Sequence, residues 1–253
     1  MTNNALVATG RYWLIGAAMV VLSACTSVSN PSQQAQTQLV STGDAATDQQ
    51  AQAFRATQLW SDAYDAKPTD IVNILGYAKA LASIGSDTRA TKILTDGLLI
   101  YPNNSDILRA QAKALSKQGL VGPALRKMNL AIKNRPKDWR LYNDIGSIHS
   151  KMGEKTLALD SFKQALKLAP NEPSIQTNLG VTYMLDRQLI LAEKHLAIAV
   201  NHPEATRQMR QNYAFVLGLQ GKYILARKIF LKDLPLSQVD ENIAQLKKIN
   251  GDK

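Results

Sequence analysis

A spacing of 34 residues recurs along this chain of 253 residues and constrains its fold more than any other feature. The prolines that mark this interval are Pro68, Pro102, Pro136 and Pro170. Alanines recur with the same spacing, twelve residues before each of these prolines, and the series runs from Ala56 to Ala226. A 34-residue period is the length of a helix–turn–helix unit that stacks into a solenoid. Because a solenoid offers an extended inner surface, the period predicts an all-α binding protein.

Glycines occupy a second position of the same repeat. Gly85, Gly119 and Gly153 each lie seventeen residues before a proline, and Gly221 keeps the phase, whereas Arg187 replaces the glycine of the copy between them. A glycine that adopts a left-handed conformation ends a helix, and a proline pushes the residue before it out of the helical region. The two residue types therefore predict where the first and second helices of each unit end.

Trp139 to Glu172 form the most complete copy of the unit. Its large and small apolar positions are Tyr142, Ile145, Gly146, Ala158, Phe162, Ala165 and Pro170. This order resembles the tetratricopeptide (TPR) repeat, in which small residues allow helix axes to approach to about 8–10 Å. The resemblance covers roughly residues 51–233, and the first copy keeps only a second helix, with Ala56, Trp60 and Ala63.

The last copy is interrupted by Asp233-Leu234-Pro235. Ser237 then opens an amphipathic segment that continues through Ile243, Leu246 and Ile249 and is interpreted as a helix covering the end of the stack. The predicted fold is thus an all-α, TPR-type α-solenoid of antiparallel helix pairs over residues 51–250, with about five to six repeats and a C-terminal capping helix.

The N-terminus has the composition of an export signal. Arg11 precedes an apolar run from Tyr12 to Leu22, which is too short for a stable membrane span. The following Leu22-Ser23-Ala24-Cys25 resembles the lipobox of bacterial lipoproteins. The resemblance implies a lipoprotein signal peptide over residues 1–24 and diacylglycerol on the Cys25 thiol, whose acyl chains anchor the chain to a membrane. An ordinary cleaved signal or a short anchor is the alternative, with Cys25 incidental.

Residues 26–48 have no aromatic or basic side chain. They cannot build a core, so residues 25–50 are interpreted as a lipidated, flexible tether. Thr26, and not aspartate, follows the cysteine, which by analogy with lipoprotein sorting favours the outer membrane over the inner one, with the solenoid in the periplasm. Nucleic acid is not an expected partner of an exported protein, despite the net charge of +10.

The sequence nominates no catalytic group. It has no nucleophile elbow, phosphate-binding loop or dinucleotide-binding glycine pattern. His149, His195 and His202 lack a second histidine or a cysteine at the spacing of metal ligands, and His149 occupies a core position of its helix. We expect no enzyme, no metal and no cofactor, and keep an enzyme or its regulatory subunit as a third class of function.

The TPR resemblance implies that one face of the first helices lines a protein-binding groove. The positions carried over are Arg109, Lys113, Lys117, Asn143, Ser147, Lys151, Thr177, Asn178, Val181, Gln211, Asn212 and Phe215. Asn178 and Asn212 correspond to a position where TPR domains often hold the backbone of a bound peptide. Residues 105–169 contain 13 Lys and Arg against 5 Asp and Glu. This excess is either a solvated basic face or an attraction for an acidic peptide or carboxylate. Binding on the convex face stays open.

Residues 207–249 carry a further resemblance. Gln211-Asn212-Tyr213-Ala214, the Asp233-Leu234-Pro235 break and the helix after it resemble the C-terminal stretch of the TadD family, the TPR lipoproteins of Tad (Flp) pilus assembly. The resemblance implies a non-catalytic, pilotin-like scaffold. Its partners would be the outer-membrane secretin or other pilus-assembly components. The alternative is an envelope adaptor for outer-membrane protein insertion or for cell-wall hydrolase complexes.

Overall fold

A computed structural model describes residues 45–251 of the chain, with side chains from residue 50 onward. These residues form twelve α-helices and no strand, which confirms the predicted all-α solenoid with a capping helix. The predicted signal peptide over residues 1–24, the Cys25 lipidation site and most of the predicted tether lie outside the described residues.

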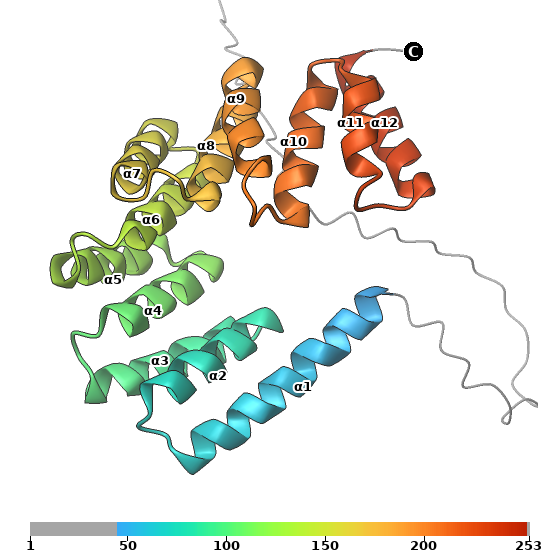
Figure 1. The fold of residues 1–253 in the computed structure, drawn as a ribbon. Helices are drawn as coiled ribbons and strands as arrows, with labels where there is room; N and C mark the ends of the chain where they lie inside the picture. The colour runs from blue at the N-terminus through green and yellow to red at the C-terminus, as the bar shows by residue number, and fades with distance from the viewer. Residues whose placement is uncertain (1–44, 252–253) are drawn as a thin grey trace, which may run out of the picture. The chain divides into compact units, whose positions relative to one another are not determined.

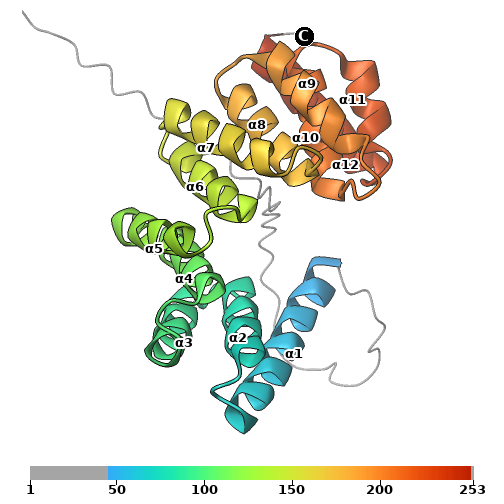
Figure 2. The same cartoon turned by 60° about the vertical axis from the view of Figure 1, so that its left-hand side comes forward.

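The helices pair in chain order (Figures 1 and 2). The first helices of the units are α2 (Ile71–Ser83), α4 (Ser105–Lys117), α6 (Trp139–Lys151), α8 (Pro173–Leu185) and α10 (Arg207–Leu219). The second helices are α1 (Ala45–Ala66), α3 (Asp87–Ile100), α5 (Val121–Asn134), α7 (Lys155–Leu168), α9 (Leu189–Val200) and α11 (Tyr223–Phe230). The chain ends in α12 (Leu236–Asn250).

The turn between the two helices of a unit has one conformation throughout. Gly85, Gly119, Gly153 and Gly221 all have a positive φ, as the sequence predicts, and Arg187 adopts the same left-handed conformation with a φ of 60°. A backbone bond reaches back across each turn, for example from the Gln188 N–H to the Tyr183 carbonyl at 2.9 Å. Such a bond satisfies a carbonyl at the end of the first helix, so the turn geometry is retained even where glycine is absent.

The first helices begin at side-chain caps. Asp70, Asn104, Asp138, Glu172 and Thr206 each accept a bond from a backbone N–H in the first turn of the helix that follows. The second helices from α3 to α11 begin without a side-chain cap. Because their first turns follow directly on the left-handed turn, the preceding first helix sets where they start.

The core repeats with the sequence. The alanines from Ala90 to Ala226 at the repeated position are completely buried. Four residues later in each unit a large side chain is buried, as at Met128 and Phe162. Phe162 packs on Gly146 of the paired helix α6, where no side chain separates the two helices. Close approach of paired helices therefore fixes the small residues of the repeat.

First helices contact one another along the stack, from α2 against α4 to α8 against α10, whereas no two second helices are in contact within residues 45–251. Each second helix from α3 to α11 packs between its own first helix and the next helix of first-helix type, which is α12 for α11. The first helices therefore line the inner side of the stack, as the groove prediction requires.

The C-terminal end of the stack is covered by α12. Val239 and Leu246 of α12 are fully buried, and Leu246 fills the space above Gly218 of α10. Helix α11 has only 8 residues because the chain turns at the Asp233-Leu234-Pro235 break before α12 begins. Ile249, expected on the covered face, is half exposed, so the buried stripe of α12 uses Val239 in its place.

Helix α1 begins at Ala45, upstream of residue 51, where the TPR resemblance placed the start of the solenoid. Residues 45–52 are mostly alanine and glutamine, which cannot form a core but have high helix propensity, so they extend a helix whose later turns are packed. None of the helices in the described range combines the length and apolar character needed to cross a bilayer.

Candidate protein-binding cleft

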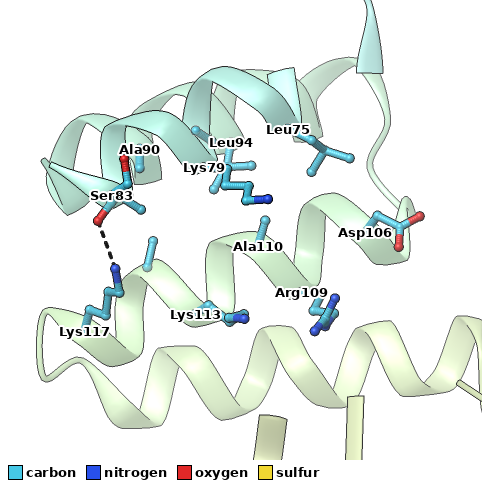
Figure 3. A pocket seen from close by; sticks show the side chains of 13 residues that line it. Leu75, Lys79, Ser83, Ala90, Leu94, Asp106, Arg109, Ala110, Lys113 and Lys117 are labelled. Carbon is cyan, nitrogen blue, oxygen red and sulfur yellow. Dashed lines mark hydrogen bonds between the residues drawn. The ribbon is translucent and has the colours of Figure 1, made fainter. Parts of the chain in front are cut away.

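A cleft of about 600 Å³ opens between α2, α3 and α4, on the side of the stack that the first helices line (Figure 3). Leu75, Lys79 and Ser83 project into it from α2 at intervals of four residues. Arg109 and Lys113 face them from α4. Because residues four apart share one face of a helix, each helix presents a single row of side chains to the cleft.

The floor of the cleft is apolar and built from small residues. Ala78, Ala90, Leu94 and Ala114 are buried beneath it, and Ala110 points from α4 towards α2. Short alanine side chains leave the volume between the two helices unfilled. A cleft of this size and composition accommodates one or two apolar side chains of a bound segment.

Cations surround the opening. Lys79 and Lys113 extend from opposite helices, and Lys117 lies at the end of α4. The Lys117 ammonium donates to the Ala82 carbonyl at 3.0 Å and lies 3.5 Å from Asp87 Oδ1. Lys117 thus links α4 to α2 and α3 of the preceding repeat. Lys79 and Lys113 remain exposed to solvent at the opening.

One carboxylate limits the positive charge of the cleft. Asp144 of α6 accepts a bond from Arg109 Nε at 2.5 Å, and its other oxygen lies 3.9 Å from Lys113 Nζ. The Asp144 side chain is 12% exposed, whereas that of Lys113 is 55% exposed. Arg109 is therefore largely neutralised, and Lys79 and Lys113 are the cations that a bound carboxylate can reach.

A second charge network lies at the other end of the cleft. Asp106 pairs with Arg135 at 2.8 Å, and Arg140 Nη2 lies 3.8 Å from it. Arg140 also forms two bonds to Asp138, at 2.8 and 2.6 Å. These bonds lower the pKa of the Asp138 carboxyl, against the effect of its partial burial, so Asp138 stays charged at neutral pH. This network joins the ends of α4 and α6.

The predicted groove residues of α6 and α8 bond to each other. The Asn178 amide donates to Asn143 Oδ1 at 2.9 Å and to Ser147 Oγ at 3.4 Å, and the Thr177 hydroxyl donates to the Pro173 carbonyl at 2.8 Å. Asn143 and Thr177 are buried. The Asn178 N–H groups are thus occupied within the protein, and binding a peptide backbone through them requires exchanging these bonds.

The remaining predicted groove residues lie away from the cleft. Lys151 is exposed in the last turn of α6, and Val181 is half-buried on α8. Gln211 and Asn212 are half-buried on α10, and Phe215 packs against the cluster below α12. The structure therefore gathers Arg109, Lys113 and Lys117 around one cleft and leaves the other nine predicted residues along the stack.

Sequence reasoning missed the α2 side of the cleft. Leu75, Lys79 and Ser83 lie 34 residues before Arg109, Lys113 and Lys117 and so occupy the same repeat positions. The repeat register alone could have nominated them. Asp144 was not predicted either, because no local pattern in the sequence shows that it pairs with Arg109.

The histidines have structural partners. His149 Nδ1 lies 2.6 Å from Glu154 Oε2, and His195 Nδ1 lies 2.8 Å from Gln176 Oε1 while its ring stacks on Tyr183. Burial lowers the pKa of His195, with a smaller contribution from Lys194, which favours its neutral form. Within the described residues, no three His, Cys, Asp or Glu side chains gather as metal ligands would.

Comparison with known sequences places residues 140–172 in the tetratricopeptide repeat model. Human protein O-mannosyl-transferase TMTC1 is 25% identical to this chain over 175 residues, which are 65% of the chain and 20% of that protein. The chain thus spans about a fifth of the length of this curated relative.

Two solved structures have a similar arrangement of helices. TTC0263, a TPR protein of Thermus thermophilus, superposes with a TM-score of 0.60 at 21% identity and covers 69% of this chain and 97% of its own. The pilF protein of Pseudomonas aeruginosa superposes with a TM-score of 0.59 at 16% identity, and the match covers 76% of this chain and 86% of the pilF chain. At this identity the likeness concerns the fold.

Proposed function

We propose that this chain, a tetratricopeptide-repeat protein, is a non-catalytic scaffold that holds a segment of another protein in the cleft between α2 and α4. The observation that carries the proposal is the combination of an alanine-lined floor with Lys79 and Lys113 at the opening. Such a cleft favours a segment in which an apolar side chain is flanked by Asp or Glu. Acidic residues reach the two lysines, while the apolar side chain replaces water above Ala110 and Ala114.

The cellular setting of the proposal rests on the sequence. Acylation of Cys25 would confine the solenoid to the periplasmic face of the outer membrane, and confinement raises the concentration of a captured subunit beside that membrane. The resemblance of residues 207–249 to the TadD family supports a secretin subunit of a Tad (Flp) pilus system as the captured protein. Function would then consist of helping the secretin to localise or assemble.

A photo-crosslinking residue at Ala110 tests the captured partner, and the same residue at the exposed Ile190 of α9 is the matched control. Envelopes are irradiated and the adducts identified by mass spectrometry. We expect a secretin adduct from position 110 and none from position 190. An adduct with an outer-membrane insertion protein or a cell-wall hydrolase would indicate that the protein serves that assembly and not a pilus system. No adduct at all would contradict capture in the cleft.

Charge reversal tests the chemistry of capture separately. Lys79→Glu with Lys113→Glu should reduce the yield of the adduct at least about tenfold, because both exposed cations become anions facing an acidic segment. Lys167→Glu, on the exposed side of α7, is the control and should leave the yield unchanged.

The acyl anchor is tested by Cys25→Ser, which should release the protein from membranes after a salt wash. Retention of that variant would contradict acyl anchoring without bearing on the cleft.

A further inference from the structure

Helix α1 has the repeat positions of a second helix, but the described residues contain no first helix paired with it. Its alanines and Trp60 occupy the repeat positions of a second helix, but among the described residues α1 packs against α2 alone. Every second helix from α3 to α11 packs between two neighbours, and α12 covers the opposite end of the stack. Within residues 45–251 the stack is therefore capped at its C-terminal end and open along one face of α1.

Exposure along α1 identifies the open face. Trp60 and Ala56 are only half-buried, whereas the residues at their positions in every later unit are fully buried. Leu59 is 71% exposed, whereas the residues at its position in the five later units are all half-buried. The missing contact is thus the one that a paired first helix makes in the complete units.

Residues 45–51 do not form the turn that would follow a first helix in the repeat arrangement. In the complete units a left-handed turn separates the two helices, and Ala51 is the residue at the turn position, 34 residues before Gly85. Here α1 continues as one helix from Ala45 through Ala51. The segment that would form the end of a first helix is therefore part of the second helix.

The open face has the pattern of an antiparallel helix pair. Its apolar positions alternate at intervals of three and four residues, through Ala56, Leu59, Ala63 and Ala66. Alanines allow two helices to approach closely, and Leu59 provides the central apolar contact. Exposed Arg55 and Asp62 lie on the flank of this stripe, on either side of its centre. Across a two-fold axis near residues 58 and 59, Arg55 of one helix faces Asp62 of the other.

From this self-complementary charge we propose that the open face of α1 binds α1 of a second copy, in an antiparallel pair that completes the unfinished unit of each chain. The interaction does not involve the cleft between α2 and α4, so it does not depend on which partner the cleft holds. One helix face is smaller than the roughly 1,600 Å² of a standard stable interface, so we expect association in the micromolar range in solution. Anchoring both copies to one membrane would raise their effective concentration.

Exchanging the charges of Arg55 and Asp62 tests whether the two α1 helices pair in the antiparallel arrangement. The full chain is studied in mild detergent, with mass measured by light scattering across a concentration series. Arg55→Asp and Asp62→Arg should each weaken self-association at least about tenfold, because each variant places like charges opposite one another. An equimolar mixture of the two variants should associate as a heterodimer, since all its facing pairs are again opposite in charge. The double variant Arg55→Asp with Asp62→Arg should regain the self-association of the wild type.

Substitution of the central contact gives a second readout. Leu59→Asp should be monomeric with an unchanged helical circular dichroism spectrum, because Leu59 is exposed and its loss leaves no cavity. Ile224→Asp, at a side chain that is 86% exposed on α11, is the matched control and should associate as the wild type does. In intact envelopes, Leu59→Cys should form a disulfide-linked adduct of twice the chain mass, whereas Ile224→Cys and the wild type should not.

Three results would overturn the proposal. A wild-type chain that stays monomeric at every concentration would mean that α1 is covered by residues 1–44 of its own chain or remains bare. A Leu59→Cys adduct of another mass would mean that a different protein supplies the missing helix. Failure of the mixed charge variants to associate, with both folded, would exclude the antiparallel pairing of Arg55 with Asp62.

Discussion

Gly146 of α6 lies directly beneath the ring of Phe162 in α7. A β-carbon at position 146 would lie 2.6 Å from Phe162 Cδ1 and Cε1, closer than carbon atoms pack in proteins. Gly180 and Leu196 repeat the relationship in the next unit, where the corresponding distance to Leu196 Cγ is 2.5 Å. In these units the glycine lets a large side chain of the second helix enter the space beside the first, and this sets the separation of the pair.

Gly146→Ala should therefore destabilise the protein although alanine is the better helix former. Overpacking costs about 1–3 kcal/mol, and the gain in helix propensity offsets up to about 1 kcal/mol of it. Because the 2.6 Å contacts are with a buried ring, we expect the upper end of that cost and a net loss of up to about 2 kcal/mol. Gly122→Ala in α5 is the control, because a β-carbon there meets only the end of the Arg126 side chain at 3.6 Å. Urea unfolding should show the two variants moving in opposite directions. A gain in stability for Gly146→Ala would mean that α6 and α7 separate freely.

Arg187 should be the least favourable turn residue of the stack. It holds a φ of 60° at the position where the other units have glycine, and a side chain in this conformation costs about 1–2 kcal/mol. Arg187→Gly removes this strain but adds freedom to the unfolded chain, so we expect a net gain of about 1 kcal/mol in urea unfolding. Arg187→Ala removes the same charge and keeps the strained backbone. Equal stabilisation by alanine would show that charge, not backbone conformation, is responsible.

Periodicity in the sequence predicted the helix pairs, their turns and the capping helix, because each depends on residues a few positions apart. Even the departure at Arg187 kept the predicted turn, since the bond from Gln188 to Tyr183 is made by backbone atoms. Residues 45–50 were interpreted as part of the tether because the composition of this region indicates that it cannot form a core. Composition alone does not show that alanine and glutamine can extend a helix whose later residues, Trp60 and Tyr64, pack against the core.

The charge of the groove was harder to predict than its position. The excess of basic residues from 105 to 169 does not show which cations are free, because Arg109 and Asp144 are 35 residues apart and meet only when α4 stacks on α6. Asn178 and Asn143 are joined across the same distance. Contacts of this kind join residues at neighbouring repeat positions in two successive units. The repeat register could therefore have predicted these pairs if it had been applied to charged and polar residues as well as to apolar ones.

Filling the cleft should abolish capture without unfolding the chain. Ala110→Phe places a ring in the space between α2 and α4, where the wild type leaves a cavity of about 600 Å³. We expect the yield of partner recovered by pull-down from envelopes to fall at least about tenfold, with a melting temperature close to that of the wild type. Ala244→Phe on the exposed side of α12 is the control. Undiminished recovery with Ala110→Phe would move the binding surface away from the cleft.

Acid should weaken the attachment of the C-terminal end through Asp233. Two bonds from Arg210, at 2.7 and 2.5 Å, hold the pKa of the Asp233 carboxyl below its usual value of 3.8. A lowered pKa means that the unfolded state binds the proton more readily, so the stability due to this group is present above pH 3.8 and is lost as the pH falls through the lower value of the folded state. The melting temperature of Asp233→Asn should therefore lie below that of the wild type at neutral pH, and the gap should narrow below pH 3.8. Asp65→Asn, exposed on α1, controls for loss of one negative charge. A gap that stays constant as the solution is acidified would mean that Asp233 acts through its shape and not through its charge.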